Sequence, residues 1–406
     1  MAYNRCILIV LDSVGIGAAP DASRFQDSQA HTLQHIGDWC QKNHAAFSLP
    51  NLSRWGIGNL VSSYGIYQPP DFRASTPTLR ELSPGKDTTT GHWEMAGTVL
   101  NYEFPVFENG FDSDLLNKWV ADNKLPGWLG NKAASGTTIL DELGEEHIRS
   151  GKPIVYTSGD SVFQIACSEE TFGLRRLYDI SVSARKLLDP LGVGRIIARP
   201  FLGKKPGEFK RTENRRDFSL PPPSPNILDV LRSRNMFVAG VGKIEDIFAH
   251  RSVNIVEHTG RNETSLESTL AVMKSTAGQR GLIFTNLIDF DQLHGHRRNP
   301  LTYAKALMDF DNFLPSLEAH TSEDDLLILT ADHGNDPTHP GTDHTRENVP
   351  LLFWSPRKDF QPRAFSTLKG FTTIARLIID SLGLQKELGK LPDCEKASSI
   401  LNEGIL

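Results

Sequence analysis

Residues 326–334 read LLILTADHG, and this stretch decides the fold, because a buried strand runs directly into an acid–histidine pair. Two other apolar runs end in a similar way. Residues 6–11 (CILIVL) precede Asp12, and residues 282–288 (LIFTNLI) precede Asp289-Phe-Asp291. Continuous apolar runs without polar alternation are typical of parallel strands that are covered on both faces.

Further short strands are expected at residues 154–157, 195–198, 236–239 and 349–354, with helical patterns between them. Ser224-Pro225 and Asn299-Pro300 each predict a helix start, with a capping residue followed by a proline in the first turn. An amphipathic segment at 372–382 ends before Gly383. This alternation of strands and helices predicts an α/β fold: a three-layer core with a mainly parallel sheet.

The middle of the chain is less regular and is rich in glycine and proline. It closes with Pro221-Pro222-Pro223-Ser224-Pro225, the strongest linker signal in the sequence. We therefore expect residues 101–222 to form an inserted, smaller α/β cap domain that binds substrate. Residues 1–100 and 223–406 would together form the metal-binding catalytic core.

Composition narrows the functional class. The chain has 406 residues, of which 39% are hydrophobic, and this content excludes a disordered chain. Its net charge of −6 argues against a nucleic-acid partner, because such partners are attracted by positive charge. Its four cysteines are widely separated, so they predict reduced thiols rather than a CxxC metal or redox pair. No apolar run approaches 18 residues. We expect a soluble cytoplasmic protein with no membrane contact and no obligate protein partner.

Histidines gather near the end of the chain, where six of the 13 lie between positions 294 and 344. Because ligands bind beyond the carboxyl ends of parallel strands, the acid–histidine segments should meet at one sheet edge. A mixture of carboxylate and imidazole suits manganese, zinc or iron. Two divalent ions there would leave a small positive charge for a phosphate dianion. The candidate ligands are Asp12, Asp291, His296, Asp332, His333 and His344.

A candidate nucleophile lies in residues 83–94, SPGKDTTTGHWE, which contain three consecutive threonines. A threonine hydroxyl becomes nucleophilic when a metal or a base removes its proton. The spacing does not choose among Thr88, Thr89 and Thr90. The alternative is structural: a threonine run also caps helices, Asp12 also suits a turn, and His344 also suits a surface loop.

Five segments resemble the phosphopentomutases, a family of the alkaline phosphatase superfamily: DSVGIG (12–17), GKDTTTGHWE (85–94), DFDQLHGHRR (289–298), TADHGNDP (330–337) and GTDHTRE (341–347). The resemblance extends over essentially the whole chain. It implies an alkaline-phosphatase-like core with a cap. It also implies interconversion of ribose 1-phosphate and ribose 5-phosphate, and of the 2-deoxyribose pair, through a phosphothreonine enzyme and a bound 1,5-bisphosphate.

The same resemblance implies roles for the site residues. Two ions, normally Mn²⁺, would be held by Asp291, His296 and His344 and by Asp12, Asp332 and His333. Thr88 matches the phosphorylated position, and a sugar bisphosphate of the glucose 1,6-bisphosphate type would be the activator.

In the cap, the resemblance implies that Ser158 and Asp160 contact the pentose phosphate and that Arg195 and Arg211 hold its distal phosphate; Lys243 matches as well. Without the family, each arginine would be read as a solvated surface charge. The sequence departs from the family pattern at three positions, Gly159, Arg216 and His31, none of which is a metal ligand or Thr88.

Two alternatives remain open. In a metal-dependent phosphatase or phosphodiesterase with the same ions, water would resolve the phosphoenzyme; the GHWE segment and the basic cap argue against it. A metal-binding protein without catalysis would lack a ligand or a nucleophile, and none is missing.

Overall fold

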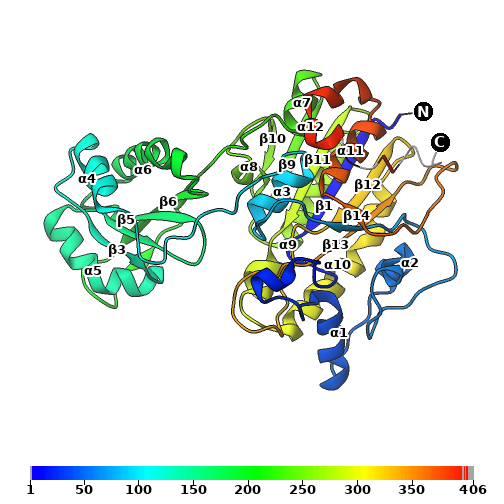
Figure 1. Ribbon diagram of the computed structural model, residues 1–406, viewed down its shortest axis with the longest axis horizontal. Helices are drawn as coiled ribbons and strands as arrows, with labels where there is room; N and C mark the ends of the chain where they lie inside the picture. Colours follow the sequence, from blue (N-terminus) through cyan, green and yellow to red (C-terminus); the bar gives the residue numbers. More distant parts are fainter. Residues whose placement is uncertain (1, 396, 398, 401–406) are drawn as a thin grey trace. The chain divides into compact units, whose positions relative to one another are not determined.

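A computed structural model describes residues 2–395, 397, 399 and 400 of the chain. It divides into two compact units (Figure 1). The core unit comprises the chain up to Tyr102 together with the chain from Pro222 onward, and the inserted unit comprises Glu103–Pro221. Within the described residues, no helix is both long enough and apolar enough to cross a membrane.

The core unit is built on an eight-stranded sheet whose three central strands are parallel. These are β11 (Gly281–Leu287), β1 (Arg5–Leu11) and β12 (Asp325–Thr330), and every residue in them is buried. Strands β9 (Phe237–Val241) and β10 (Ile255–Glu257) extend the sheet beyond β11. On the other side follow β13 (Val349–Trp354), which is antiparallel to β12, then β2 (Thr78–Arg80) and β14 (Leu368–Lys369).

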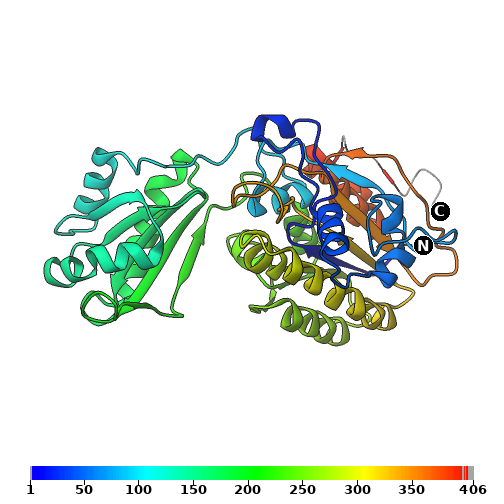
Figure 2. The same cartoon turned by 90° about the horizontal axis from the view of Figure 1, so that it is seen from below.

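Helices cover both faces of this sheet, which gives the three layers. Figure 2 shows the yellow-green helices α9 (Asn262–Ser275) and α10 (Pro300–His320) along one face and the red helix α11 (Thr372–Ser381) along the other. The prediction of an α/β core with a mainly parallel sheet is confirmed. The remaining helices of this unit are α1 (Thr32–Lys42), α2 (Pro50–Trp55), α3 (Thr88–Met95), α7 (Ile227–Ser233), α8 (Ile244–Ile247) and α12 (Pro392–Glu395).

The two predicted helix starts differ in outcome. Helix α10 begins at Pro300 with Asn299 as its cap, as predicted. The prediction for Ser224-Pro225 is wrong, because α7 begins two residues later, after Asn226. The Asn226 side chain accepts hydrogen bonds from the backbone of Leu228 and Asp229, and the Asp229 carboxylate accepts one from the Asn226 N–H. This reciprocal capping box satisfies more backbone donors than a serine–proline start would.

The inserted unit has a mixed six-stranded sheet. Its strands are β3 (Leu129–Ala133), β4 (Ile154–Thr157), β5 (Val162–Ser168), β6 (Arg195–Leu202), β7 (Lys210–Arg211) and β8 (Arg216–Ser219). Helices α4 (Ser113–Asp122) and α6 (Leu174–Leu188) pack on one face over a core that includes Trp119, Phe163 and Ile196. Helix α5 (Gly136–Ser150) packs on the other face against a smaller core that includes Tyr156 and Phe201.

Candidate metal centre

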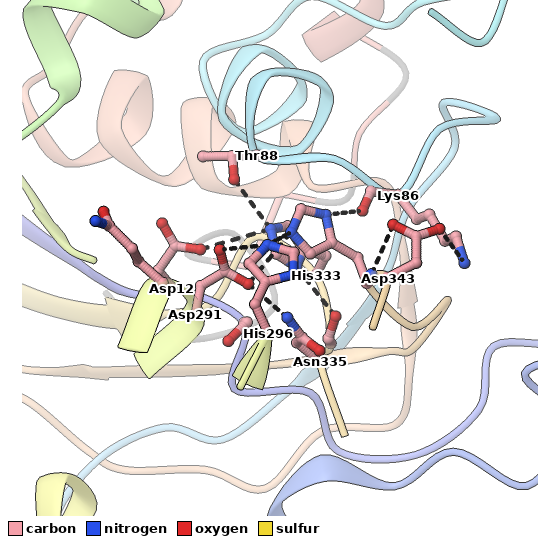
Figure 3. A network of polar contacts seen from close by, with 12 residues as sticks. Asp12, Lys86, Thr88, Asp291, His296, His333, Asn335 and Asp343 are labelled. Carbon is pink, nitrogen blue, oxygen red and sulfur yellow. Dashed lines mark hydrogen bonds and ion pairs between the residues drawn. The ribbon is translucent and has the colours of Figure 1, made fainter. Parts of the chain in front are cut away.

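The ends of the three central strands bring the acidic and histidine residues together. Asp12 follows β1, and Asp332 and His333 follow β12. After β11 the chain forms a short π-helical turn, η4 (Phe290–Gly295), which carries Asp291. Because β1 pairs in parallel with both neighbours, all three ends lie at one edge of the sheet. Figure 3 shows Asp12, Asp291, His296 and His333 gathered there.

One group consists of Asp12, Asp332 and His333. The His333 Nε2 atom lies 3.5 Å from Asp12 Oδ1 and 3.3 Å from Asp332 Oδ2. Both of these carboxylate oxygens are buried. Asp12 Oδ1 accepts no hydrogen bond from any residue that the structure describes, and Asp332 Oδ2 lies 3.2 Å from Nδ1 of the buried His92. Burial, together with the carboxylates of Asp332 and Asp291, raises the pKa of Asp12 well above its usual value. A buried, unpartnered anionic oxygen is costly, so this group fits a bound cation.

The second group consists of Asp291, His296 and His344. The Nε2 atoms of His296 and His344 each lie 3.2 Å from a carboxylate oxygen of Asp291 and 3.1 Å from one another. Burial acts to raise the pKa of Asp291, but the two histidines outweigh it and hold that pKa well below its usual value. The His333 ring stacks on that of His344 with 3.9 Å between centroids, so the two groups are adjacent.

The three histidine rings are oriented in the same way, each by a hydrogen bond from Nδ1 to a backbone carbonyl. Nδ1 of His333 donates to the carbonyl of Gly334 at 3.1 Å, Nδ1 of His344 to that of Lys86 at 3.0 Å, and Nδ1 of His296 to that of Thr342 at 2.7 Å. A carbonyl only accepts, so Nδ1 carries a proton, and in the neutral imidazole Nε2 is then the acceptor nitrogen. This is the tautomer that a metal-ligating histidine needs.

Hydrogen-bond donors also fix the three carboxylates. Asp332 Oδ1 accepts from the Ser13 N–H at 3.0 Å, and Asp12 Oδ2 accepts from Asn286 Nδ2 at 2.8 Å. Asp291 Oδ1 accepts from Asn335 Nδ2 at 2.7 Å. The nitrogen and oxygen ligands and their oriented partners therefore fit a pair of divalent metal ions.

Helix α3 places one threonine hydroxyl beside the centre. Asp87 caps the helix, so Thr88 is its first residue. Thr88 Oγ1 lies 3.2 Å from Nε2 of His333. The hydroxyl of Thr90 is engaged differently, because it donates to Asp87 Oδ2 at 2.5 Å. The structure thus brings Thr88 to the candidate ligands and ties Thr90 to the helix cap.

The rest of the GHWE segment holds α3 against the metal-bearing strands. A Cβ atom on Gly91 would lie 2.3 Å from the Asp332 carbonyl oxygen, so only glycine permits this approach. Nδ1 of the buried His92 donates to the Thr88 carbonyl at 2.8 Å. The Glu94 carboxylate accepts from the N–H groups of Ser83 at 2.6 Å and Phe371 at 2.8 Å. These contacts are structural, yet they set the position of the candidate nucleophile.

Sequence reasoning missed several residues that orient the ligands. Asn286 is a polar residue inside the apolar run 282–288, and that interruption was a signal. Arg298 donates to Asn335 Oδ1 at 2.7 Å and to the carbonyls of Asp336 and Asp343 at 2.7 and 2.8 Å. It therefore holds both Asn335 and the loop that delivers His344; it lies in the segment 289–298 that carries the resemblance, but the sequence did not indicate these partners.

The predicted substrate residues lie in two places. Lys243 belongs to the core unit, where its Nζ is 3.4 Å from Gln292 Oε1. In the inserted unit, Asp160 Oδ2 is 3.3 Å from Arg195 Nη2, and Ser158 lies in the same β4–β5 loop as Asp160. Arg211 lies on β7 and is exposed.

Comparison with known proteins identifies relatives over most of the chain. The metalloenzyme superfamily matches residues 4–386. A phosphopentomutase of Hahella chejuensis is 46% identical over 404 residues, which cover 94% of this chain and 97% of the relative. A phosphopentomutase of Caldanaerobacter subterraneus is 49% identical over 356 residues, covering 87% of this chain and 88% of the relative.

Solved structures with a similar arrangement are more distant. Phosphoglycerate mutase of Leishmania mexicana has a TM-score of 0.46 and 12% identity, covering 94% of this chain and 96% of that one. The alkaline phosphatase of the Antarctic bacterium TAB5 has a TM-score of 0.38 and 12% identity, covering 94% and 98%. These likenesses are too weak to support any statement about function.

Proposed function

The chain belongs to the phosphopentomutase family of the metalloenzyme superfamily and is a metal-binding isomerase, and from this premise we propose how its residues perform the reaction. The enzyme interconverts ribose 1-phosphate and ribose 5-phosphate, together with the 2-deoxyribose pair. The observation that carries the mechanism is the 3.2 Å contact between Thr88 Oγ1 and His333 Nε2, beside two buried carboxylates.

Thr88 is the residue that carries the phosphoryl group between turnovers. The Thr88 phosphoester bond breaks as the free hydroxyl of the sugar phosphate forms a new bond to phosphorus, which gives a bound 1,5-bisphosphate. The other phosphate then returns to Thr88, and the isomeric monophosphate leaves. A sugar bisphosphate of the glucose 1,6-bisphosphate type supplies the first phosphoryl group. A protein nucleophile is needed because the phosphoryl group must wait while the sugar reorients.

The proposed ligands divide as the two groups do. Asp291, His296 and His344 would hold one ion and Asp12, Asp332 and His333 the other, and the mixed nitrogen and oxygen donors favour Mn²⁺ over Mg²⁺. When bound, such a pair supplies positive charge to the transferring phosphoryl oxygens and to the Thr88 hydroxyl. The carbonyls of Gly334, Lys86 and Thr342 accept from Nδ1 and fix the orientation of each imidazole, so that Nε2 is directed toward the proposed ligand group.

The inserted unit supplies substrate contacts. Ser158 and Asp160 contact the pentose phosphate, and Arg195 and Arg211 bind the phosphate that is not being transferred. Arginine suits this task because its planar fork matches phosphate oxygens. Lys243 adds a cation from the core unit. All four described cysteines are free thiols, which supports a reducing, cytoplasmic location.

The decisive experiment is a coupled assay of ribose 1-phosphate with added Mn²⁺ and glucose 1,6-bisphosphate, in which ribose 5-phosphate and free phosphate are measured in parallel. We expect isomer without stoichiometric free phosphate. Release of phosphate at the rate of substrate loss would instead identify a phosphatase with the same metal centre. No product of either kind would refute the proposed function.

A further inference from the structure

His92 lies one helical turn after Thr88 on α3, and its side chain is fully buried. Its imidazole stacks on the ring of Phe284 in β11, with 5.7 Å between the centroids and 18° between the planes. The ring therefore lies between the helix that carries the candidate nucleophile and a central strand that leads to the candidate metal ligands. Because a buried imidazole needs a partner at each nitrogen, the two sides of the ring are considered in turn.

The Nδ1 side of His92 faces two acceptors. The Thr88 carbonyl oxygen lies 2.8 Å from Nδ1, and Oδ2 of the buried Asp332 lies 3.2 Å from it. A carbonyl oxygen only accepts, so Nδ1 carries a proton. One N–H group thus faces both the backbone of the candidate nucleophile and the side chain of a candidate metal ligand.

The Nε2 side of His92 faces the amide of Asn286, which is also buried. Asn286 Nδ2 lies 2.8 Å from Asp12 Oδ2 and 3.3 Å from His92 Nε2. A carboxylate accepts, which directs the amide NH2 group rather than Oδ1 toward Asp12, and the second N–H of that group reaches Nε2. With Nδ1 protonated, Nε2 of the neutral imidazole accepts this hydrogen bond. A chain of hydrogen bonds therefore runs from the Thr88 carbonyl through His92 and Asn286 to Asp12.

We propose that His92 is a positioning residue that couples the candidate nucleophile to one of the two metal-ligand groups. Through Nδ1 it holds the Thr88 carbonyl beside Asp332. Through Nε2 and Asn286 it fixes the orientation of Asp12. It exchanges no proton with the substrate, because the ring is fully buried and both nitrogens have partners. That Thr88 receives the phosphoryl group rests on the proposed function; the coupling of His92 to the metal ligands does not.

A histidine with a purely structural role is available for comparison in the inserted unit. His147 on α5 is buried like His92. Its Nδ1 donates to the Lys152 carbonyl at 2.7 Å, and its Nε2 accepts from the Ser168 N–H at 2.9 Å. It therefore has the same tautomer and the same number of partners, but none of them is a candidate ligand or nucleophile. The same substitution at His147 is the matched control.

The first test is a calorimetric Mn²⁺ titration of the full chain, with two binding steps expected. The step that is missing from Asp332→Ala belongs to the group that His92 contacts. In His92→Leu this step should weaken by about tenfold or more, the effect expected for a residue that orients metal ligands, and the other step should change less than about threefold. His147→Leu should leave both steps unchanged. Equal weakening of both steps in His92→Leu, or no weakening of either, would overturn the coupling.

Kinetics at saturating Mn²⁺ test the other end of the chain of hydrogen bonds. His92→Leu should lower kcat about 100-fold, as expected when a reacting group is displaced by about 1 Å. The KM for ribose 1-phosphate should change less than about threefold, because the buried ring does not reach the substrate. His92→Asn, whose amide still donates to the Thr88 carbonyl, should recover most of the lost kcat. A kcat in His92→Leu no lower than that of His147→Leu would overturn the inference.

A second measurement is made on the wild-type chain. In metal-free protein labelled with ¹⁵N-histidine, the His92 ring signals, assigned by their absence from His92→Asn, should show a protonated Nδ1 and an unprotonated Nε2. They should shift as diamagnetic Zn²⁺ is added, whereas the His147 signals should not. A protonated Nε2, or His92 signals that stay fixed at saturating Zn²⁺, would contradict the coupling. If these signals behave as expected but the enzyme isomerises no pentose phosphate, the proposed function fails and the coupling stands.

Discussion

The two charged clusters of this chain are built in opposite ways. In the core unit, short aspartate and histidine side chains follow buried strands, and each is turned by a backbone or amide hydrogen bond. In the inserted unit, long arginine side chains stand on an open sheet face, and Arg211 is exposed. Short side chains lose little entropy on being fixed, whereas arginine loses far more. We infer that the core unit holds its side chains in a fixed geometry for catalysis, whereas the arginine side chains of the inserted unit can adapt their positions to the substrate.

The strongest test of this division is Thr88→Ala. The variant should keep its fold and both metal ions but lose isomerase activity by more than about 10³-fold, as expected for a missing nucleophile. Incubation with radiolabelled glucose 1,6-bisphosphate should label the wild-type peptide that contains Thr88 and leave the variant unlabelled. Thr89→Ala is the matched control and should retain label and most activity. Label on Thr89, or an active Thr88→Ala enzyme, would disprove the assignment.

The next largest effect is expected from Asp332→Ala. Removal of this buried carboxylate takes a ligand from one ion and leaves Asp12 and His333 to hold it alone. We expect metal analysis to find one ion per chain rather than two, with nearly all turnover lost because both ions are needed for the transfer. In the parent enzyme, chelation should abolish activity and Mn²⁺ should restore it best. Full activity of the stripped protein would contradict the two-metal centre.

Variants of the inserted unit should behave differently. Arg211→Ala should raise the KM for ribose 5-phosphate through a loss of about 1.5–3 kcal/mol, the range for charged hydrogen bonds. Arg195→Ala should raise it less, because Arg195 is already paired with Asp160. Metal content should be unchanged in both. Steady-state kinetics beside metal analysis separates the two units, and an unaltered KM in both variants would show that these arginines are only surface charges.

The strands of the core could be predicted from the sequence, because a strand that is buried on both faces appears there as a continuous apolar run. Strands β4 and β13 have the predicted bounds, and β1 begins one residue early, at Arg5. Helix α7 was placed wrongly, because a serine–proline pair and the nearby Asn226 compete as start signals and only the Asp229 contact decides between them.

For the candidate site too, some features could be predicted from the sequence and others could not. Ligand types at strand ends are visible in the sequence, so the acid–histidine segments could be expected to meet. Partners across the fold are not visible: Thr88 is distinguished from Thr90 by its contact with His333, which lies 245 positions away in the sequence. Asn286 was the one orienting residue with a local signal, a polar residue in a buried strand.

The smallest effect is expected from Asn286→Ala, which asks how far the rigidity of the core site depends on its orienting partners. Asn286 Nδ2 donates to Asp12 Oδ2 at 2.8 Å, while Asp12 Oδ1 faces His333. Without the amide, Asp12 keeps its charge but loses one fixed orientation. Mn²⁺ affinity should therefore fall by about tenfold, the lower end of the range for such partners. Calorimetric Mn²⁺ titration measures this affinity. If Mn²⁺ binds as tightly as in the wild type, Asp12 is held by the strand alone and the contrast between the two clusters rests on the backbone rather than on this hydrogen bond.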